Sequence, residues 1–257
     1  MGAISLRPQP DQPITLMQQS IERILHAQGF GSRKACRILI NSGEVSVNGM
    51  LCDDPSTRFD LDGLQFTVRD EPWDYRAKAY LMLHKPAHHE CSHKPLHHPS
   101  IYRLLPHPLI ARGVQCIGRL DEDTTGLILL SDDGQFIHRM SSPKWKVPKV
   151  YAVTTRHPVN EAQISALREG VQLVDEPAPI AALDCQKIED QLIHLTLAEG
   201  KYHQVKRMLA AVSNRVEALE RIRIGPLELP DTLAPGQWRW LTDAELAALY
   251  QGSKPEA

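Results

Sequence analysis

The sequence predicts an α+β protein with two domains: a small one of helices and short strands, then a larger one with a mixed, largely antiparallel β-sheet and flanking helices. Its 257 residues fit one large or two smaller domains. Near residue 70 the pattern changes from helices followed by short strands to many strands with intervening helices. Those strands do not alternate strictly with helices, which disfavours a doubly wound parallel sheet.

Composition excludes several classes of protein. The apolar content of 42% is enough for a core, yet no apolar run approaches the roughly 20 residues of a membrane span. The first twenty residues lack the apolar core of a secretory signal. The cysteines are odd in number, scattered and without a Cys-x-x-Cys pair, which predicts free thiols and a cytoplasmic location. They are Cys36, Cys52, Cys91, Cys116 and Cys185.

Local sequence features set the expected boundaries. The first residues contain Pro8, Pro10 and Pro13 and little to bury, which predicts a disordered tail. An acidic stretch ends near Pro72, and the charge changes sign after it, which indicates a linker. The expected order is a tail at 1–19, a first domain at 20–70, a linker at 71–78, a second domain at 79–252 and a tail at 253–257.

Two helices are expected to open the first domain. Ile21, Ile24 and Leu25 recur at helical spacing, and two glycines then end the pattern. Ser32 can N-cap a second helix that continues to residue 40. The segment Val45–Val47, followed by Asn-Gly, predicts a strand that enters a tight turn.

The second domain is expected to hold at least seven strands and three helices. The predicted strands are Tyr80–Leu83, Val114–Ile117, Leu127–Leu130, Val150–Thr154, Val171–Val174, Leu192–Leu197 and Arg221–Ile224. The predicted helices are Glu161–Glu169, Gln204–Val212 and Asp243–Tyr250, the last with a capping box at Thr242 and Glu245.

The net charge of the chain is −2, but two of its segments are strongly basic. Residues 75–120 carry seven Lys or Arg against one acid, and residues 138–156 carry five against none. Such blocks can present a positive face to a polyanion. Charge alone fits two solvated faces equally well.

The most unusual segment is the polar loop Gly118–Gly126, which lies between two apolar stretches. It holds three carboxylates and two threonines, and functional groups are commonly placed on such loops; the alternative is a plain acidic hairpin loop. From Asp121 the spacing also imitates a calcium loop, which needs a helix on each side and a Glu at its twelfth position. Here both flanks predict strands and Asp132 occupies that position, so we expect no calcium site.

A histidine-rich segment follows the first strand of the second domain. Its spacing fits no helical or ribbon zinc pattern, and three prolines indicate a loop. We therefore expect an exposed basic loop without a metal. Its histidines and cysteine are His84, His88, His89, Cys91, His93, His97 and His98.

Three cations stand at the start of the second helix of the first domain: Arg33, Lys34 and Arg37. The helix dipole is positive there, which disfavours cations unless an anion binds. This arrangement suits a phosphate.

Four motifs of the second domain occur in the order found in the RsuA family of pseudouridine synthases, which residues 80–250 resemble. The motifs are LHKPA (Leu83–Ala87), GRLDEDTTGLILLSDDG (Gly118–Gly134), KVYAV (Lys149–Val153) and EGKYHQVKRM (Glu199–Met208). Residues 21–68 resemble an S4 RNA-binding domain. The version YHQVKRM, followed by RIRIG and LAPGQWRWLT, is most similar to the family members that modify 16S rRNA.

The resemblance implies roles for individual residues. Asp121 matches the catalytic aspartate of the family, Tyr151 the tyrosine that packs on the target uracil, and Lys206 the basic partner of the aspartate. Arg119 lies where a related family uses an arginine to fill the gap left by a flipped base. The chain departs from the family at His88, where glycine is usual, so this loop is expected to differ in shape or in RNA contact.

The chemistry of pseudouridine formation fits these residue types. The reaction breaks the N1–C1′ bond of uridine, rotates the base and rejoins it through C5, so no cofactor is expected. A carboxylate can act at the sugar or the base, or remove a proton from the sugar, and the sequence leaves these routes open. A stacked base cannot reach such a site, so the target must be flipped out or unpaired.

The expected partner is ribosomal RNA, either free 16S rRNA or 16S rRNA in a partly assembled small subunit, bound by a monomer without membrane contact. Two alternatives remain: a synthase of the same family that acts on 23S rRNA, and an RNA-binding assembly factor with an idle site. The residues expected to contact RNA are Ser32, Arg33, Lys34, Arg37, Asn48, Lys85, Arg119, Lys149 and Arg207.

Overall fold

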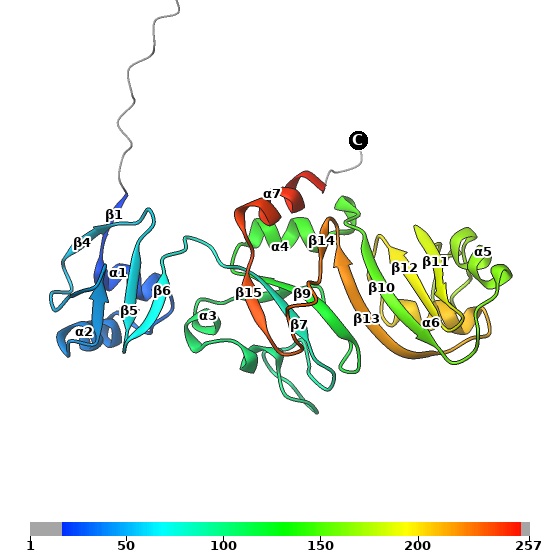
Figure 1. Cartoon of the computed structure of the whole chain (residues 1–257), viewed down its shortest axis with the longest axis horizontal. Coiled ribbons are helices and arrows are strands. Elements are labelled where there is room, and N and C mark those ends of the chain that lie inside the picture. Colours follow the sequence, from blue (N-terminus) through cyan, green and yellow to red (C-terminus); the bar gives the residue numbers. More distant parts are fainter. Residues whose placement is uncertain (1–16, 253–257) are drawn as a thin grey trace, which may run out of the picture. The chain divides into compact units, whose positions relative to one another are not determined.

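The structure, a computed structural model, describes residues 17–252 (Figure 1). The chain forms two compact units that divide between Ala77 and Lys78. The predicted tails lie outside the described residues at 1–16 and 253–257. The N-terminal tail predicted at 1–19 extends too far along the chain, because strand β1 (Gln18–Ser20) pairs with β4 (Arg58–Asp60).

The N-terminal unit begins with both predicted helices, α1 (Ile21–Ala27) and α2 (Arg33–Asn41). The side chain of Ser32 caps α2 as predicted, accepting a hydrogen bond of 3.2 Å from the backbone N–H of Ala35. The three apolar residues that predicted α1 are fully buried in the core of this unit.

A four-stranded sheet completes the N-terminal unit, in the order β3-β2-β5-β6. The predicted turn joins β2 to β3, and its residues Asn48 and Gly49 both have the positive φ that such a turn requires. The strands are β2 (Val45–Val47), β3 (Met50–Leu51), β5 (Gln65–Val68) and β6 (Glu71–Asp74).

The linker predicted at 71–78 is wrong over its first half, because β6 occupies it and pairs with β5. Pro72 is compatible with a strand here, since β6 lies at the edge of the sheet and a missing N–H disrupts no further strand pair.

The larger unit is built on a mixed, mostly antiparallel sheet, as the sequence predicts. The strand order is β11-β12-β10-β13-β9-β7-β15, with β14 beside β13 and β8 beside β9. Strands β9 and β13 run parallel, and the other pairs run antiparallel. The strands are β7 (Tyr80–Lys85), β8 (Gln115–Ile117), β9 (Thr125–Ser131), β10 (Lys149–Thr155), β11 (Asp184–Glu189), β12 (Leu192–Leu197), β13 (Val216–Ile224), β14 (Leu227–Glu228) and β15 (Trp238–Trp240).

Helices cover both faces of this sheet (Figure 1). On β9, Leu127 and Leu129 pack with α4 and α7, whereas Ile128 and Leu130 join the core that contains α5 and α6. Burial on both faces explains why β9 is a continuous apolar run. The helices are α3 (His107–Ala111), α4 (Gly134–Ser141), α5 (Glu161–Glu169), α6 (Gln204–Ala211) and α7 (Asp243–Gly252), with short 3₁₀ helices at Ile101–Leu104 and Pro143–Trp145.

Most predicted elements are confirmed, with bounds that match exactly or differ by at most five residues, and a few are wrong or missed. The strand predicted at Val171–Val174 is wrong, because only an isolated bridge between Val171 and Ile180 forms there. Strand β11 was not predicted because its sequence is polar, with Cys185 as its one buried residue. All five cysteines are free, as predicted.

A close contact between two strands fixes the loop that precedes β9. Gly126 of β9 pairs with Arg221 of β13, and a Cβ at Gly126 would lie 2.4 Å from the backbone oxygen of Arg221. Its φ of 106° is also one that residues with a side chain rarely adopt. Glycine therefore allows the two halves of the sheet to meet directly beside the polar loop.

Candidate active site

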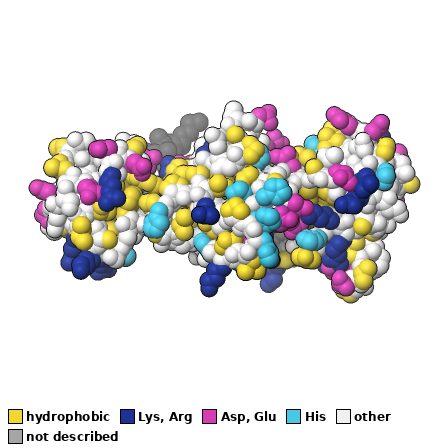
Figure 2. All heavy atoms as spheres, turned by 90° about the horizontal axis from the view of Figure 1, so that it is seen from below, with side chains coloured by type: hydrophobic (Ala, Val, Ile, Leu, Met, Phe, Trp, Pro, Cys, Tyr) yellow, Lys and Arg dark blue, Asp and Glu magenta, His cyan; other side chains and the backbone are white. Residues whose placement is uncertain are grey.

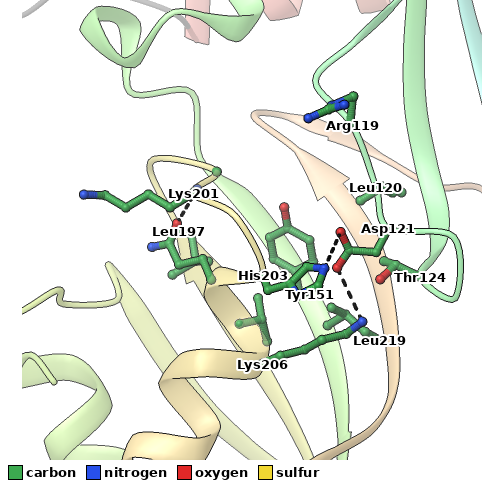
Figure 3. A pocket seen from close by; sticks show the side chains of 13 residues that line it. Arg119, Leu120, Asp121, Thr124, Tyr151, Leu197, Lys201, His203, Lys206 and Leu219 are labelled. Carbon is green, nitrogen blue, oxygen red and sulfur yellow. Dashed lines mark hydrogen bonds and ion pairs between the residues drawn. The ribbon is translucent and has the colours of Figure 1, made fainter. Parts of the chain in front are cut away.

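A pocket opens where the loop between β8 and β9 faces β10, β13 and the start of α6 (Figure 3). Its lining includes Arg119, Asp121, Tyr151 and Lys206, four residues that the sequence singles out. The side chains of His203 and Lys206 point toward the carboxylate of Asp121 (Figure 3). The fold thus brings together residues that are far apart in the sequence.

Asp121 lies on a loop that is braced from inside. Its backbone oxygen accepts the N–H of Thr124 at 3.1 Å, which closes a turn. Behind this turn the amine of Lys85 donates to the backbone oxygens of Glu122 at 3.0 Å and of Thr124 at 2.7 Å, and to that of Pro86 at 3.1 Å. Asp121 is consequently presented on a rigid support, with its side chain about one-third exposed.

Lys206, in the first turn of α6, contacts two carboxylates. Its Nζ lies 3.4 Å from Oδ2 of Asp121 and donates to the two oxygens of Asp123 at 2.7 and 2.8 Å. Burial lowers the pKa of Lys206, but the hydrogen bond to Asp123 and the charges of Asp121 and Asp123 outweigh burial and raise the pKa. Lys206 is therefore a cation at neutral pH, shared by both carboxylates.

His203 is a pocket residue that the sequence did not assign to the site. Its Nε2 lies 3.4 Å from Oδ1 of Asp121, and its backbone adopts a left-handed conformation at the N-cap of α6. The ring of Tyr202 stacks on it with centroids 3.9 Å apart. Its position three residues before Lys206, which places both near one side of the helix start, is the signal that could have found it.

Tyr151, on β10, supplies an apolar wall beside Asp121. The residue is 7% exposed, and Leu219 of β13 lines the same pocket. A flat aromatic ring in this place can pack against a planar base, and its hydroxyl can donate or accept a hydrogen bond.

Of two lysines expected to contact RNA, Lys85 is fully buried and Lys149 is half-buried. Lys85 is fully buried, and its amine donates to three backbone oxygens, so that prediction is wrong. The amine of Lys149 donates to the backbone oxygen of Val147, and burial, aided by the charge of Arg221, lowers the pKa of Lys149 to about 8. Residue type predicted surface cations at both positions, but the fold uses both amines to bind backbone oxygens.

The other two RNA-contact candidates of the larger unit differ in their surroundings. Arg119 is exposed at the pocket wall. Arg207 lies 3.8 Å from Asp175 and 3.7 Å from Glu176, so acidic side chains already neutralise part of its charge.

The RNA-contact candidates of the N-terminal unit lie in two places, the start of α2 and the turn between β2 and β3. Arg33 and Lys34 are exposed, and Ser32 is the N-cap described above. Arg37 pairs with Glu22 at 2.6 Å. Asn48 is exposed in the turn. Figure 2 shows a group of Lys and Arg side chains at the lower edge of this unit and a separate group above it.

No helix within residues 17–252 combines the length and the apolar content needed to cross a membrane.

Both units are similar to known families. Residues 79–211 match the family described as RNA pseudouridylate synthase, and residues 21–63 match the S4 domain family. The chain is 42% identical over 234 residues to ribosomal small subunit pseudouridine synthase A of Yersinia pestis, covering 90% of this chain and 94% of that protein. It is 36% identical over 235 residues to the uncharacterized RNA pseudouridine synthase YtzG of Bacillus subtilis, covering 90% and 98%. A crystal structure of a pseudouridylate synthase is similar with a TM-score of 0.64 and 35% identity, covering 90% of this chain and 99% of that one.

Proposed function

Since this chain belongs to the RNA pseudouridylate synthase family, we propose that it converts a uridine of 16S ribosomal RNA into pseudouridine. The similarity to the small-subunit enzyme of Yersinia pestis, which extends over 90% of the chain, supports this substrate. The observation that carries the proposal is the carboxylate of Asp121 at the pocket, 3.4 Å from both Nζ of Lys206 and Nε2 of His203.

In this proposal Asp121 supplies the reacting carboxylate. The cation of Lys206 compensates its charge in the half-enclosed pocket, and the braced loop keeps the carboxylate in place. An ionised carboxylate can attack the sugar or the base, or accept a proton from the sugar. Each route ends in the same exchange within one nucleotide: the N1–C1′ bond breaks, a C5–C1′ bond forms, C5 loses a proton and N1 gains one.

Tyr151 is proposed to hold the detached uracil while it turns. Its ring forms the apolar wall next to Asp121, so the base can pack flat against it without leaving the pocket. The target must leave the RNA stack to enter the pocket, and Arg119, which is exposed at the pocket wall, is proposed to occupy the gap that the target leaves.

The S4 domain is proposed to add phosphate contacts, through Arg33 and Lys34 at the start of α2. We further propose that the protein acts as a monomer in the cytoplasm, where its five free thiols stay reduced.

The substrate is tested with purified protein and three unmodified RNAs: a 16S rRNA transcript, a 23S rRNA transcript and the 16S rRNA of small subunits. Mass-spectrometric mapping of each RNA locates any pseudouridine formed. We expect one site in 16S rRNA, free or within the subunit. A product confined to 23S rRNA would overturn the proposed substrate, and no product on any RNA would overturn the proposed reaction.

A further inference from the structure

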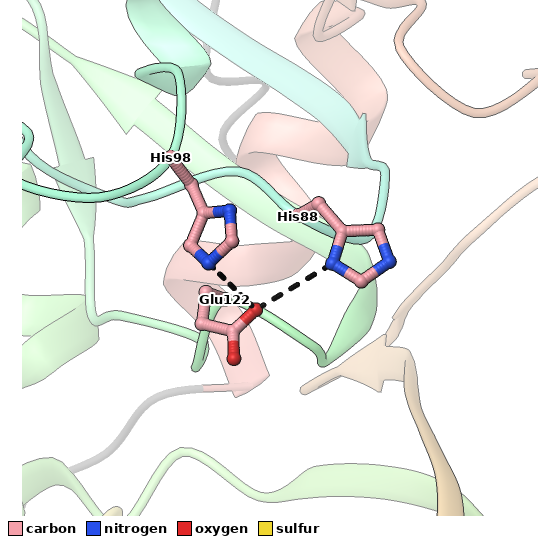
Figure 4. A group of neighbouring side chains, drawn as sticks. All are labelled: His88, His98 and Glu122. Atoms are coloured by element: carbon pink, nitrogen blue, oxygen red, sulfur yellow. Dashed lines mark ion pairs between the residues drawn. The ribbon is translucent and has the colours of Figure 1, made fainter.

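Two histidines and a glutamate converge from separate loops beside the pocket (Figure 4). His88 and His98 belong to the histidine-rich segment, and Glu122 follows Asp121 in the loop between β8 and β9. Nδ1 of His88 lies 3.7 Å, and Nε2 of His98 3.6 Å, from the same Oε2 atom of Glu122. Figure 2 shows histidine and acidic side chains side by side on the surface of the larger unit.

The spacing of these three atoms is close to that of metal ligands. In a tetrahedral zinc site with bonds of about 2.0–2.1 Å, two ligand atoms are roughly 3.3 Å apart. Both histidine–glutamate distances exceed this by less than about half an ångström. All three ligand atoms lie within 4.8 Å of one another, so small side-chain rotations suffice to close the site around one ion.

The backbone already holds the ligand loops together. The N–H of His88 donates to the backbone oxygen of Glu122 at 2.7 Å, and the buried amine of Lys85 donates to the same oxygen at 3.0 Å. The carboxylate of Glu90 accepts the backbone N–H groups of three successive residues that end at His98. These hydrogen bonds fix the turn that presents His98.

The backbone of His88 lies in the left-handed region, with a φ of 58°, which glycine adopts without strain. Its imidazole is 75% exposed.

We infer that His88, His98 and Glu122 form a binding site for a divalent transition-metal ion of the zinc class. Two neutral imidazoles and one carboxylate suit zinc, whereas magnesium and calcium prefer oxygen ligands throughout. Both histidines lie within ion-pair distance of the carboxylate of Glu122. His88 and Glu122 are exposed and His98 is half-buried, so water can reach the site. Histidine spacing alone predicts no metal here, because the third ligand comes from a different loop.

Isothermal titration calorimetry with zinc chloride tests the site on the untagged full-length chain, with its thiols kept reduced. Four proteins are compared: the unchanged chain, His88→Gly, Glu122→Gln and His97→Ala. His88→Gly removes one ligand and also relieves the left-handed backbone, so it is expected to fold. His97→Ala is the matched control, since it removes an exposed histidine of the same loop that lies outside the cluster.

We expect the unchanged chain and His97→Ala to bind one equivalent of zinc with equal affinity, and the two ligand variants to bind at least about tenfold more weakly. Zinc should raise the melting temperature of the unchanged chain and of His97→Ala, but not that of the two ligand variants. No binding by the unchanged chain, or equal affinity in all four proteins, would overturn the inference and leave the cluster as a set of ion pairs. No RNA is present, so the outcome is independent of the proposed function.

Discussion

Replacing Gly126 by alanine should lower the free energy of unfolding of the larger unit by roughly 2–6 kcal/mol. The added Cβ would lie 2.4 Å from the backbone oxygen and 2.6 Å from the backbone nitrogen of Arg221, where β9 and β13 run side by side. Forcing these backbones apart costs about 1–3 kcal/mol, as overpacking does elsewhere. The φ of 106° adds strain of about 1–3 kcal/mol for a residue with a side chain.

Urea unfolding followed by tryptophan fluorescence measures the loss, with Gly134→Ala as the matched control. A Cβ at Gly134 would meet no atom within 4 Å, and this glycine begins α4. Alanine favours a helix over glycine by up to about 1 kcal/mol, so the control should be as stable as the unchanged chain or more stable. If Gly126→Ala proved as stable as Gly134→Ala, the strand contact beside the polar loop would not restrict this position to glycine.

Three further changes test other parts of the molecule. Lys206→Met should slow pseudouridine formation more than Lys206→Arg in single-turnover assays, because only arginine keeps a cation beside Asp121; equal losses would mean that charge is not what this position supplies. Removing residues 1–77 should weaken RNA affinity and flatten its salt dependence by roughly 0.7–0.9 per lost phosphate contact. Filter binding at several salt concentrations measures both, and unchanged slopes would exclude phosphate contacts from the S4 domain. Glu245→Gln should lower stability at neutral pH by about 1 kcal/mol, since Glu245 completes the capping box of α7 and binds Arg239. The hydrogen bond to Arg239 holds the pKa of Glu245 at about 2, below its usual 4.5, so the advantage of the unchanged chain exists above pH 4.5 and is lost as the pH falls toward 2. Urea midpoints of both proteins, measured from neutral pH down to pH 2, test this pH dependence. A stability advantage of the unchanged chain that persists in full at pH 2 would count against the ion pair.

Helix ends and buried strands could be predicted because local signals determine them. The predicted helix Glu161–Glu169 matches α5 residue for residue, since Asn160 caps its start and Gly170 ends it. β6 could not be predicted, because its proline and acidic residues are typical of linkers and only pairing with β5 makes the segment a strand. Short or polar strands such as β15 and β11 likewise depend on neighbours that no local pattern reveals.

The resemblance to a known family named Asp121, Tyr151 and Lys206, and the structure places them in one pocket. The resemblance could not indicate how charge is shared in this pocket, where Lys206 lies closer to Asp123 than to Asp121. Nor could residue type show that Lys85, a cation in a basic block, is fully buried beneath the loop. Both facts depend on three-dimensional contacts between segments far apart in the sequence.

The role proposed for Asp121 is tested most directly by single-turnover pseudouridine formation with Asp121→Asn on 16S rRNA. RNA affinity is measured in parallel, and Asp123→Asn serves as the control, being the same change on the same loop. Asparagine keeps the size of the side chain but removes its charge and its nucleophilic oxygen. We expect no product above background from Asp121→Asn with RNA affinity unchanged, and measurable product from Asp123→Asn. If Asp121→Asn kept more than a small fraction of the rate of the unchanged chain, Asp121 would not be the reacting carboxylate.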